Sequence, residues 1–188
     1  MKKLVLILAL IVWLPGVKGW AVDNYLHTED MLTFDNVGYR LGWSSHPNDI
    51  QYLQEYFPEG QTAESFTDML SVWLFFVDLP AEQWIQRMAD SYAARKGTDP
   101  ACHFETYEND GEYMFDCLRS EEGMTAVEFN VYRCRNVKVD GRDALLICFY
   151  TGDAYGDDIK PFLTRLKERR GQLIEAMIGF EMPEVSLK

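Results

Sequence analysis

Positive charge is concentrated between residues 160 and 170 of an otherwise acidic chain. The sequence has 18 basic and 30 acidic residues and a formal net charge of −12. Five of the basic residues fall in this short stretch: Lys160, Arg165, Lys167, Arg169 and Arg170. Because Lys and Arg bind carboxylates and phosphates, the cluster could contact an anionic group or an acidic partner. The simpler interpretation is the solvated side of an amphipathic helix, because one charged face is normal for a surface helix.

The four cysteines, all in the second half of the chain, predict crosslinks. They are Cys102, Cys117, Cys134 and Cys148, and no two of them form a Cys-x-x-Cys motif. Zinc binding and thioredoxin-like chemistry are therefore disfavoured, and an exported chain would normally oxidise such residues to disulfides. Four cysteines allow three connectivities, and hairpin register favours one of them.

The preferred connectivity follows from two hairpin loops. A four-residue loop over 108–111 would set Cys102 opposite Cys117, and an odd loop centred on Gly141 would set Cys134 opposite Cys148. We therefore expect the bridges Cys102–Cys117 and Cys134–Cys148. A two-residue Asp-Gly turn in the second hairpin would shift its register by one residue.

The motifs of common catalytic and cofactor sites are missing from the sequence. His27, His46 and His103 are the only histidines, and no Gly-x-Ser-x-Gly, Gly-x-Gly-x-x-Gly or Gly-Lys-Ser/Thr string occurs. Asp153 and the pair Asp157-Asp158 could offer oxygen ligands to calcium, but their spacing differs from that of a twelve-residue calcium loop. We predict no catalytic residue, no metal site and no cofactor.

The N-terminus has the pattern of a secretory signal peptide. Lys2 and Lys3 precede an apolar run over 4–14, and cleavage after Gly19 would follow the usual small-residue preference. The run is too short for a transmembrane helix. We therefore expect residues 1–19 to be removed, no transmembrane anchor to remain, and the mature protein to be periplasmic or secreted.

The charge of the mature chain limits its partners. Removing residues 1–19 takes away three basic residues and no acid, which leaves a formal net charge of −15. Such a field repels nucleic acid and anionic membrane surfaces. We expect no nucleic-acid binding.

The pattern of strands and helices predicts an α+β fold. Residues 20–36 are expected to be irregular, and residues 37–188 to form a single α+β domain. Its antiparallel sheet of about six or seven strands would be packed by two main helices. Asp78 is expected to cap the first helix and Pro80 to lie in its first turn, and the second helix would start near Asp157. The expected strands cover residues 37–43, 50–56, 70–77, 104–107, 113–118, 126–134 and 144–150.

The strand over 70–77 is apolar on both faces. Leu70, Val72 and Leu74 alternate with Trp73 and Phe75. A strand of this kind belongs in the interior of a sheet that is covered on both sides. We therefore expect these residues to form core rather than a binding surface.

The element order, together with the string "PEGQTAESFTDML" at 58–70, resembles known exported proteins. The order from residue 37 to 178 behind a signal peptide resembles the PsbP/DcrB-like group of small α+β envelope and lumenal proteins. The string is similar to a pattern in exported bacterial proteins, with Phe66 where that pattern has Trp. The resemblance implies a sheet between helices and a non-catalytic accessory or binding role, and it assigns no functional residue.

The sequence therefore favours a non-catalytic binding or assembly accessory of the cell envelope. Its partner would be an unknown envelope protein or a small ligand. A carboxylate-dependent hydrolase is one alternative, and it would need a cleft with two close acids of raised pKa. An acidic inhibitor or immunity-type module is the other, and it would need a contiguous acidic patch with exposed aromatic residues.

Overall fold

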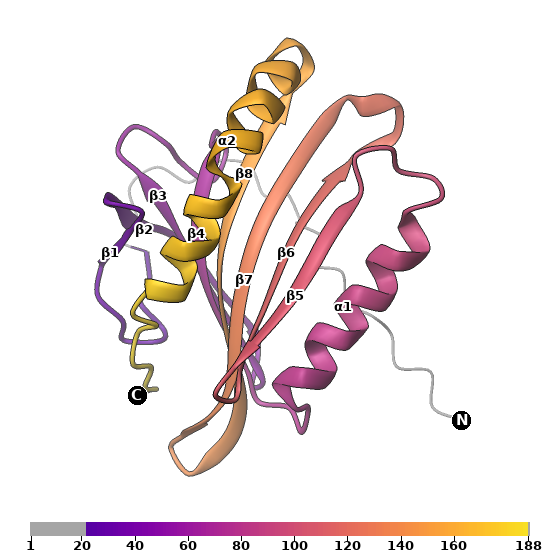
Figure 1. The fold of residues 1–188 in the computed structure, drawn as a ribbon. Helices are drawn as coiled ribbons and strands as arrows, with labels where there is room; N and C mark the ends of the chain where they lie inside the picture. The colour runs from indigo at the N-terminus through magenta and orange to yellow at the C-terminus, as the bar shows by residue number, and fades with distance from the viewer. Residues whose placement is uncertain (1–21, 188) are drawn as a thin grey trace.

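The computed structural model describes residues 22–187, and the predicted signal peptide over 1–19 lies outside them. The fold is α+β, with one antiparallel sheet of eight strands in the order β1-β2-β3-β4-β8-β7-β6-β5 and two α-helices (Figure 1). The strands are β1 (Met31–Phe34), β2 (Val37–Asn48), β3 (Gln51–Pro58), β4 (Asp68–Phe75), β5 (His103–Asn109), β6 (Glu112–Ser120), β7 (Ala126–Val139) and β8 (Arg142–Tyr155). The helices are α1 (Ala81–Arg95) and α2 (Ile159–Gly179), and short 3-10 turns occupy Glu122–Met124 and Gly156–Asp158.

The predicted fold class is correct, and the predicted strand number is too low. The additional strand is β1, which lies in the segment 20–36 that was expected to be irregular. It pairs with β2 through a two-residue turn in which Asp35 and Asn36 have φ values of 47° and 63°. Asn and Asp tolerate the left-handed region better than most residues, and such a turn joins antiparallel strands tightly.

The two helices cover opposite faces of the sheet. Successive residues of β8 divide between two buried clusters: Cys148 lies in the cluster that includes Leu173 of α2, whereas Phe149 lies in the cluster that includes Ile85 of α1. This alternation is the period-two pattern of a strand that is buried on both sides. We call these two sides the α2 face and the α1 face.

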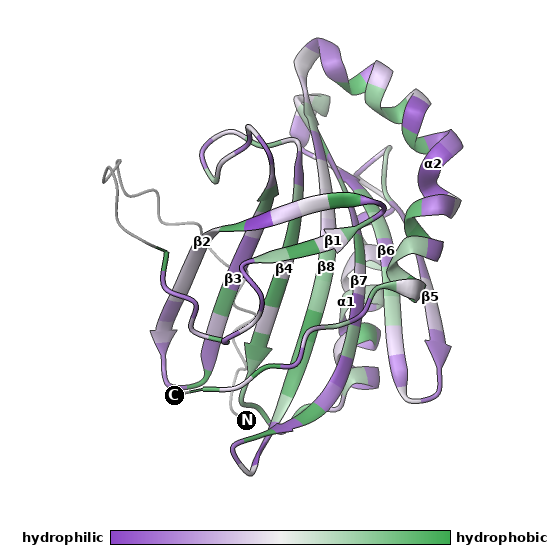
Figure 2. Cartoon of the chain, turned by 90° about the vertical axis from the view of Figure 1, so that its left-hand side faces the viewer, coloured by the Kyte–Doolittle hydropathy of each residue, from purple (hydrophilic) through white to green (hydrophobic). Residues whose placement is uncertain are grey.

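The predicted interior position of β4 is confirmed. It lies between β3 and β8, with Val72 and Leu74 fully buried on the α2 face and Trp73 and Phe75 packed against the α1-face cluster. Figure 2 shows hydrophobic residues along these central strands and hydrophilic residues on the outer side of α2.

The terminal segments cover the part of the α2 face that α2 leaves open. Leu26 is fully buried, and its backbone N–H donates to Oε1 of Gln54 at 2.8 Å. Ser186 N–H donates in turn to the Leu26 carbonyl at 3.1 Å. The two ends of the described chain therefore pack together against the sheet.

The first helix is capped from the sheet. The Ala81 N–H donates to Oδ1 of Asn136 at 2.8 Å, and Nδ2 of Asn136 donates to the Leu79 carbonyl at 3.0 Å. The expectation that Asp78 caps this helix is wrong, because Pro80 occupies the N-cap position without a side-chain hydrogen bond. A residue of β7 satisfies a free donor of the first turn and fixes the helix to the sheet.

The expected disulfides are absent, and all four cysteines are free thiols. Both hairpins close with two-residue Asp-Gly turns, in which Asp110, Gly111, Asp140 and Gly141 all have positive φ. That is the geometry of a type I′ turn, and it changes both registers.

In the first hairpin, Phe104 rather than Cys102 lies opposite Cys117. In the second, Ile147 lies opposite Cys134, so Cys134 faces α1 while Cys148 faces α2. Directly opposed cysteines were the premise of both bridges, and neither hairpin provides them.

Candidate functional site

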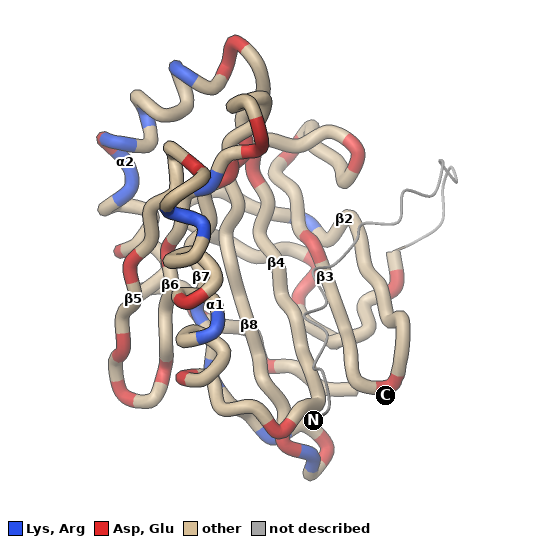
Figure 3. The backbone as a smooth tube through the Cα atoms, turned by 90° about the vertical axis from the view of Figure 1, so that its right-hand side faces the viewer, with Lys and Arg blue, Asp and Glu red and all other residues tan. Residues whose placement is uncertain are grey.

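The five basic residues of 160–170 all lie on α2, where Figure 3 shows Lys and Arg in blue. Their contacts divide them into two groups. Arg169 pairs with Asp35 at 2.7 Å. Arg170 pairs with the fully buried Asp116 through two hydrogen bonds of 2.8 and 2.9 Å, and with Glu105 at 3.2 Å. These two arginines attach α2 to the rest of the molecule.

The other three cations of the cluster remain available for binding. No hydrogen bond or ion pair joins the side chains of Lys160, Arg165 and Lys167 to another residue of the described chain. Of these three, only Arg165 lines the larger cavity of the α2 face.

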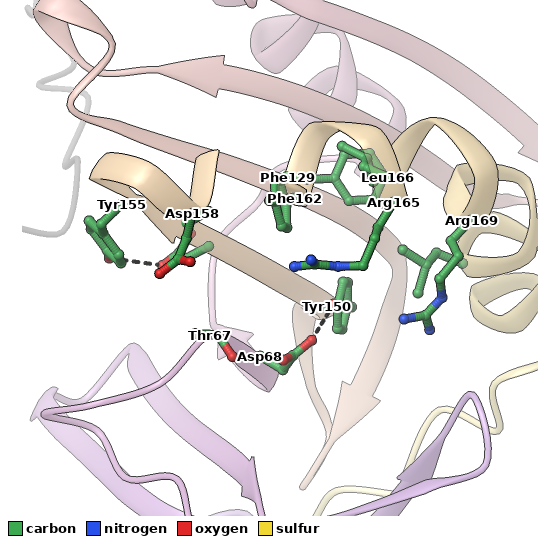
Figure 4. A pocket seen from close by; sticks show the side chains of 13 residues that line it. Thr67, Asp68, Phe129, Tyr150, Tyr155, Asp158, Phe162, Arg165, Leu166 and Arg169 are labelled. Atoms are coloured by element: carbon green, nitrogen blue, oxygen red, sulfur yellow. Dashed lines mark hydrogen bonds between the residues drawn. The ribbon is translucent and has the colours of Figure 1, made fainter. Parts of the chain in front are cut away.

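That cavity has a volume of about 230 Å³ and lies between the N-terminal half of α2 and the ends of β4 and β8. Figure 4 shows the Arg165 side chain extending from α2 toward the space above Asp68 and Tyr150. Its lining combines acids, arginines, tyrosines and an apolar wall: Thr67, Asp68, Phe129, Tyr150, Asp153, Ala154, Tyr155, Asp158, Phe162, Arg165, Leu166, Arg169 and Leu173.

Asp68 and Tyr150 form the polar floor. The Tyr150 hydroxyl donates to Oδ1 of Asp68 at 2.6 Å, and the Thr67 hydroxyl donates to Oδ2 at 2.9 Å. Burial, and then the Asp68 carboxylate, raise the pKa of Tyr150 far above its ordinary value. The phenol therefore keeps its proton and holds Asp68 in place as a fixed acceptor.

Gly152 leaves room for this floor. A Cβ at this position would lie 3.0 Å from the Tyr150 hydroxyl and 3.4 Å from Cε2 of Phe162. Gly152 is also the residue of β8 that pairs with Asp68 of β4. The absence of a side chain thus lets Tyr150 lie flat against the strand and reach Asp68.

Asp153 lines one end of the cavity, but its side chain belongs to the α1 face. Its neighbours Gly152 and Ala154 face α2, so Asp153 faces the other side of the sheet. In the register of β7 and β8, Asp153 lies directly opposite Glu128. Burial, and then the charge of Glu128, raise the pKa of Asp153 to about 7. Its Oδ2 accepts from the Tyr155 hydroxyl at 3.3 Å, and its buried Oδ1 has no partner.

Asp68 and Asp153 therefore do not form a catalytic pair. Asp68 and Asp153 project to opposite sides of the sheet, whereas acid–base catalysis by two carboxylates needs both beside the same bond. The described residues also contain no group of three or more His, Cys, Asp or Glu side chains that could hold a metal ion. The cavity is suited to binding through charges and hydrogen bonds.

A second, smaller cavity of about 170 Å³ lies under the same half of α2. Lys167 and Arg170 line it together with an imidazole and four apolar side chains: His103, Leu118, Phe129, Leu163 and Leu166. Phe129 and Leu166 also line the first cavity, so these two side chains separate the two spaces.

Asp68 and Tyr150 could not be found from local sequence signals. They are far apart in the chain and meet only because β4 pairs with β8. A signal for Arg165 did exist in the basic cluster, but spacing alone could not separate it from Arg169 and Arg170.

The fold and this site define an α+β protein with a sheet between two helices and a cavity beneath the second helix. A protein-family model matches residues 26–182, and the chain belongs to that family. No curated protein and no solved structure matches the chain. None of the helices within residues 22–187 has the length and apolar character needed to cross a bilayer.

Proposed function

We propose that this protein is a non-catalytic binding protein whose cavity beneath α2 takes a small ligand with an anionic group. The observation that carries the proposal is Arg165: its guanidinium extends into the cavity and pairs with no acid of the described chain. The neighbouring Arg169 and Arg170 are both in ion pairs. A guanidinium offers several parallel donors, which match a carboxylate or a phosphate.

The opposite wall adds a second requirement. Asp68 is held by donors from Tyr150 and Thr67, and its carboxylate is the fixed acceptor of the floor. A ligand group that donates hydrogen bonds, such as an amine, amide or hydroxyl, would suit it. The best-fitting ligand therefore has one anionic group for Arg165 and one donor for Asp68.

The setting of the proposed function is the cell envelope or the extracellular space. The signal-peptide pattern over 1–19 and the resemblance to the PsbP/DcrB-like group support this setting and the accessory role. A concave cavity of about 230 Å³ favours a small molecule over a protein partner, because small-ligand sites are concave and protein interfaces are broad.

A ligand screen with two matched variants tests the proposal. Amino acids, sugar acids and sugar phosphates at millimolar concentration would be added to the purified protein, and binding would be followed by NMR chemical shifts and by thermal melting. For the best compound, Arg165→Gln should weaken binding about tenfold to a hundredfold, because a charge-assisted contact is lost. Lys160→Gln removes the same charge from the same helix outside the cavity, and it should leave the affinity unchanged.

Two outcomes would contradict the proposal. One is that no compound in the three classes shifts resonances of cavity residues. The other is that Arg165→Gln and Lys160→Gln weaken binding equally, which would reduce the role of Arg165 to a general field effect.

A further inference from the structure

The two cavities beneath α2 differ in chemistry. The first is lined by acids, arginines and tyrosines, whereas the second is walled by four apolar side chains with Lys167, Arg170 and His103 around them, and no carboxylate lines it. The space for a charged or polar group therefore adjoins a space for an apolar group.

Two side chains line both spaces. Phe129 on β7 and Leu166 on α2 line both cavities, and both are largely buried. One comes from the sheet and the other from the helix, so the two cavities adjoin at the contact between α2 and β7.

The helix is fixed firmly at its other end. Arg133 of β7 donates from Nη1 to the carbonyls of Met177, Ile178 and Phe180 at 2.8–2.9 Å. Ile159 and Leu166 are buried in the N-terminal half of α2 and Leu173 and Met177 in the C-terminal half, whereas Phe162 and Leu163 are only partly buried. Gly171 lies between the two halves, and glycine is the most flexible residue of a helix interior. The three residues whose carbonyls Arg133 holds line neither cavity.

We propose that the ligand is a single-chain anionic amphiphile, with its polar head at Arg165 and Asp68 and its apolar chain running past Leu166 into the second cavity. This inference rests on the proposed function and specifies its ligand class. The apolar walls contributed by Leu118, Leu163 and Phe129 provide the burial that an acyl or aromatic chain needs. Because the second cavity is lined by cations and by no carboxylate, it does not repel the anionic head of a ligand that passes it.

A series of N-acylglycines tests the inference with a constant head group. Each compound presents a carboxylate for Arg165 and an amide N–H for Asp68, and the acyl chain is lengthened from two to ten carbons below its micelle concentration. Isothermal titration should show affinity rising about fourfold for each added methylene until the second cavity is full, and a plateau thereafter.

Two substitutions separate the head site from the chain site. Leu163→Trp fills the second cavity from a half-buried position that does not line the first. It should abolish the dependence on chain length while N-acetylglycine binds as before. Arg165→Gln should weaken every member of the series by the same factor. Circular dichroism and thermal melting confirm that both variants are folded, and Leu163→Met is the volume-conserving control.

The possible failures are distinguishable. Arg165-dependent binding whose strength does not depend on chain length would overturn the amphiphile inference and leave the proposed function in place. Binding that rises with chain length but ignores Arg165→Gln would overturn the head site and with it the proposed function. Equal affinity for an alkylamine of the same length would show non-specific apolar adsorption and overturn the inference.

Discussion

At the scale of single residues, Asp153 is a buried acid whose surroundings disfavour its charged form. It is 8% exposed, it lies opposite Glu128, and one of its oxygens has no partner. Its pKa is raised from 3.8 to about 7, first by burial. The folded protein therefore keeps a proton on Asp153 at pH values where the unfolded chain has released it.

This difference predicts a pH-dependent gain of stability in Asp153→Asn. As the pH rises from about 4 to about 7, the wild type loses at most about 1.4 kcal/mol of stability per pH unit. The reason is that ionisation of Asp153 favours the unfolded chain. The neutral amide avoids that loss, so the variant should be more stable than the wild type by about 1–3 kcal/mol at pH 8 and nearly equal to it at pH 4. Urea unfolding at both pH values measures the difference.

The control is Asp157→Asn, at an exposed position in the neighbouring turn. It should show no comparable change between the two pH values. A variant Asp153→Asn that is less stable than the wild type at pH 8 would show that the carboxylate makes a favourable interaction that the structure does not contain.

At the scale of elements, the attachment of α2 depends on Arg133. Besides the three carbonyls at the end of the helix, its guanidinium donates from Nε to Glu112 at 2.6 Å, and its side chain is 17% exposed. A cation at a helix C-terminus satisfies free carbonyls and interacts favourably with the helix dipole. Arg133 thus links the long β7–β8 hairpin to the end of α2.

Arg133→Met should lower the free energy of unfolding by about 2–3 kcal/mol, because the carbonyls and Glu112 lose a charged donor while the aliphatic packing is largely kept. Denaturant unfolding monitored by circular dichroism measures the loss. Arg135→Met is the matched control: Arg135 pairs with the same Glu112 at 3.1 Å but contacts no carbonyl of α2. Equal effects of the two substitutions would assign the stabilisation to Glu112 instead of the helix end.

At the scale of the whole molecule, the sequence predicted the fold class better than the registers. Period-two and period-3.6 patterns located two helices and seven of the eight strands, because burial on defined faces imposes those periods. The eighth strand is β1, and its only local signal is the turn dipeptide Asp35-Asn36 that joins it to β2. Hairpin register depends on turn conformation. The positive φ values at 110–111 and 140–141 belong to two-residue turns, and these give registers that differ from those of the expected longer loops.

The candidate site was only partly predictable for a different reason. The basic cluster on α2 is local in sequence and was found, whereas the partners of its members come from distant strands. Asp116 and Asp35 pair with Arg170 and Arg169 across more than fifty residues. Which arginine remains for a ligand is decided by strand order, and no periodicity encodes that order.

The corrected registers predict four free thiols in the folded protein. Alkylation of protein denatured without reductant should add four labels, and fewer labels would show that crosslinks form in spite of the register. In the native state labelling should be slow at Cys117, Cys134 and Cys148, because burial raises the pKa of each to about 12 and the thiolate is the reactive form. The half-buried Cys102 should react first.

The end of the sheet at β5 has a consequence for behaviour in concentrated solution. Within the described chain β5 pairs with β6 alone, so its outer side presents unpaired backbone groups that could template another strand. Glu105 and Glu108 are exposed along this strand. A hydrogen bond from Tyr107 lowers the pKa of Glu105, and the contact with Arg170 lowers it further. Charged side chains on an edge strand disfavour edge-to-edge pairing with a second copy. Resistance to edge-to-edge association therefore depends on the acids of one strand as well as on the net charge of the molecule.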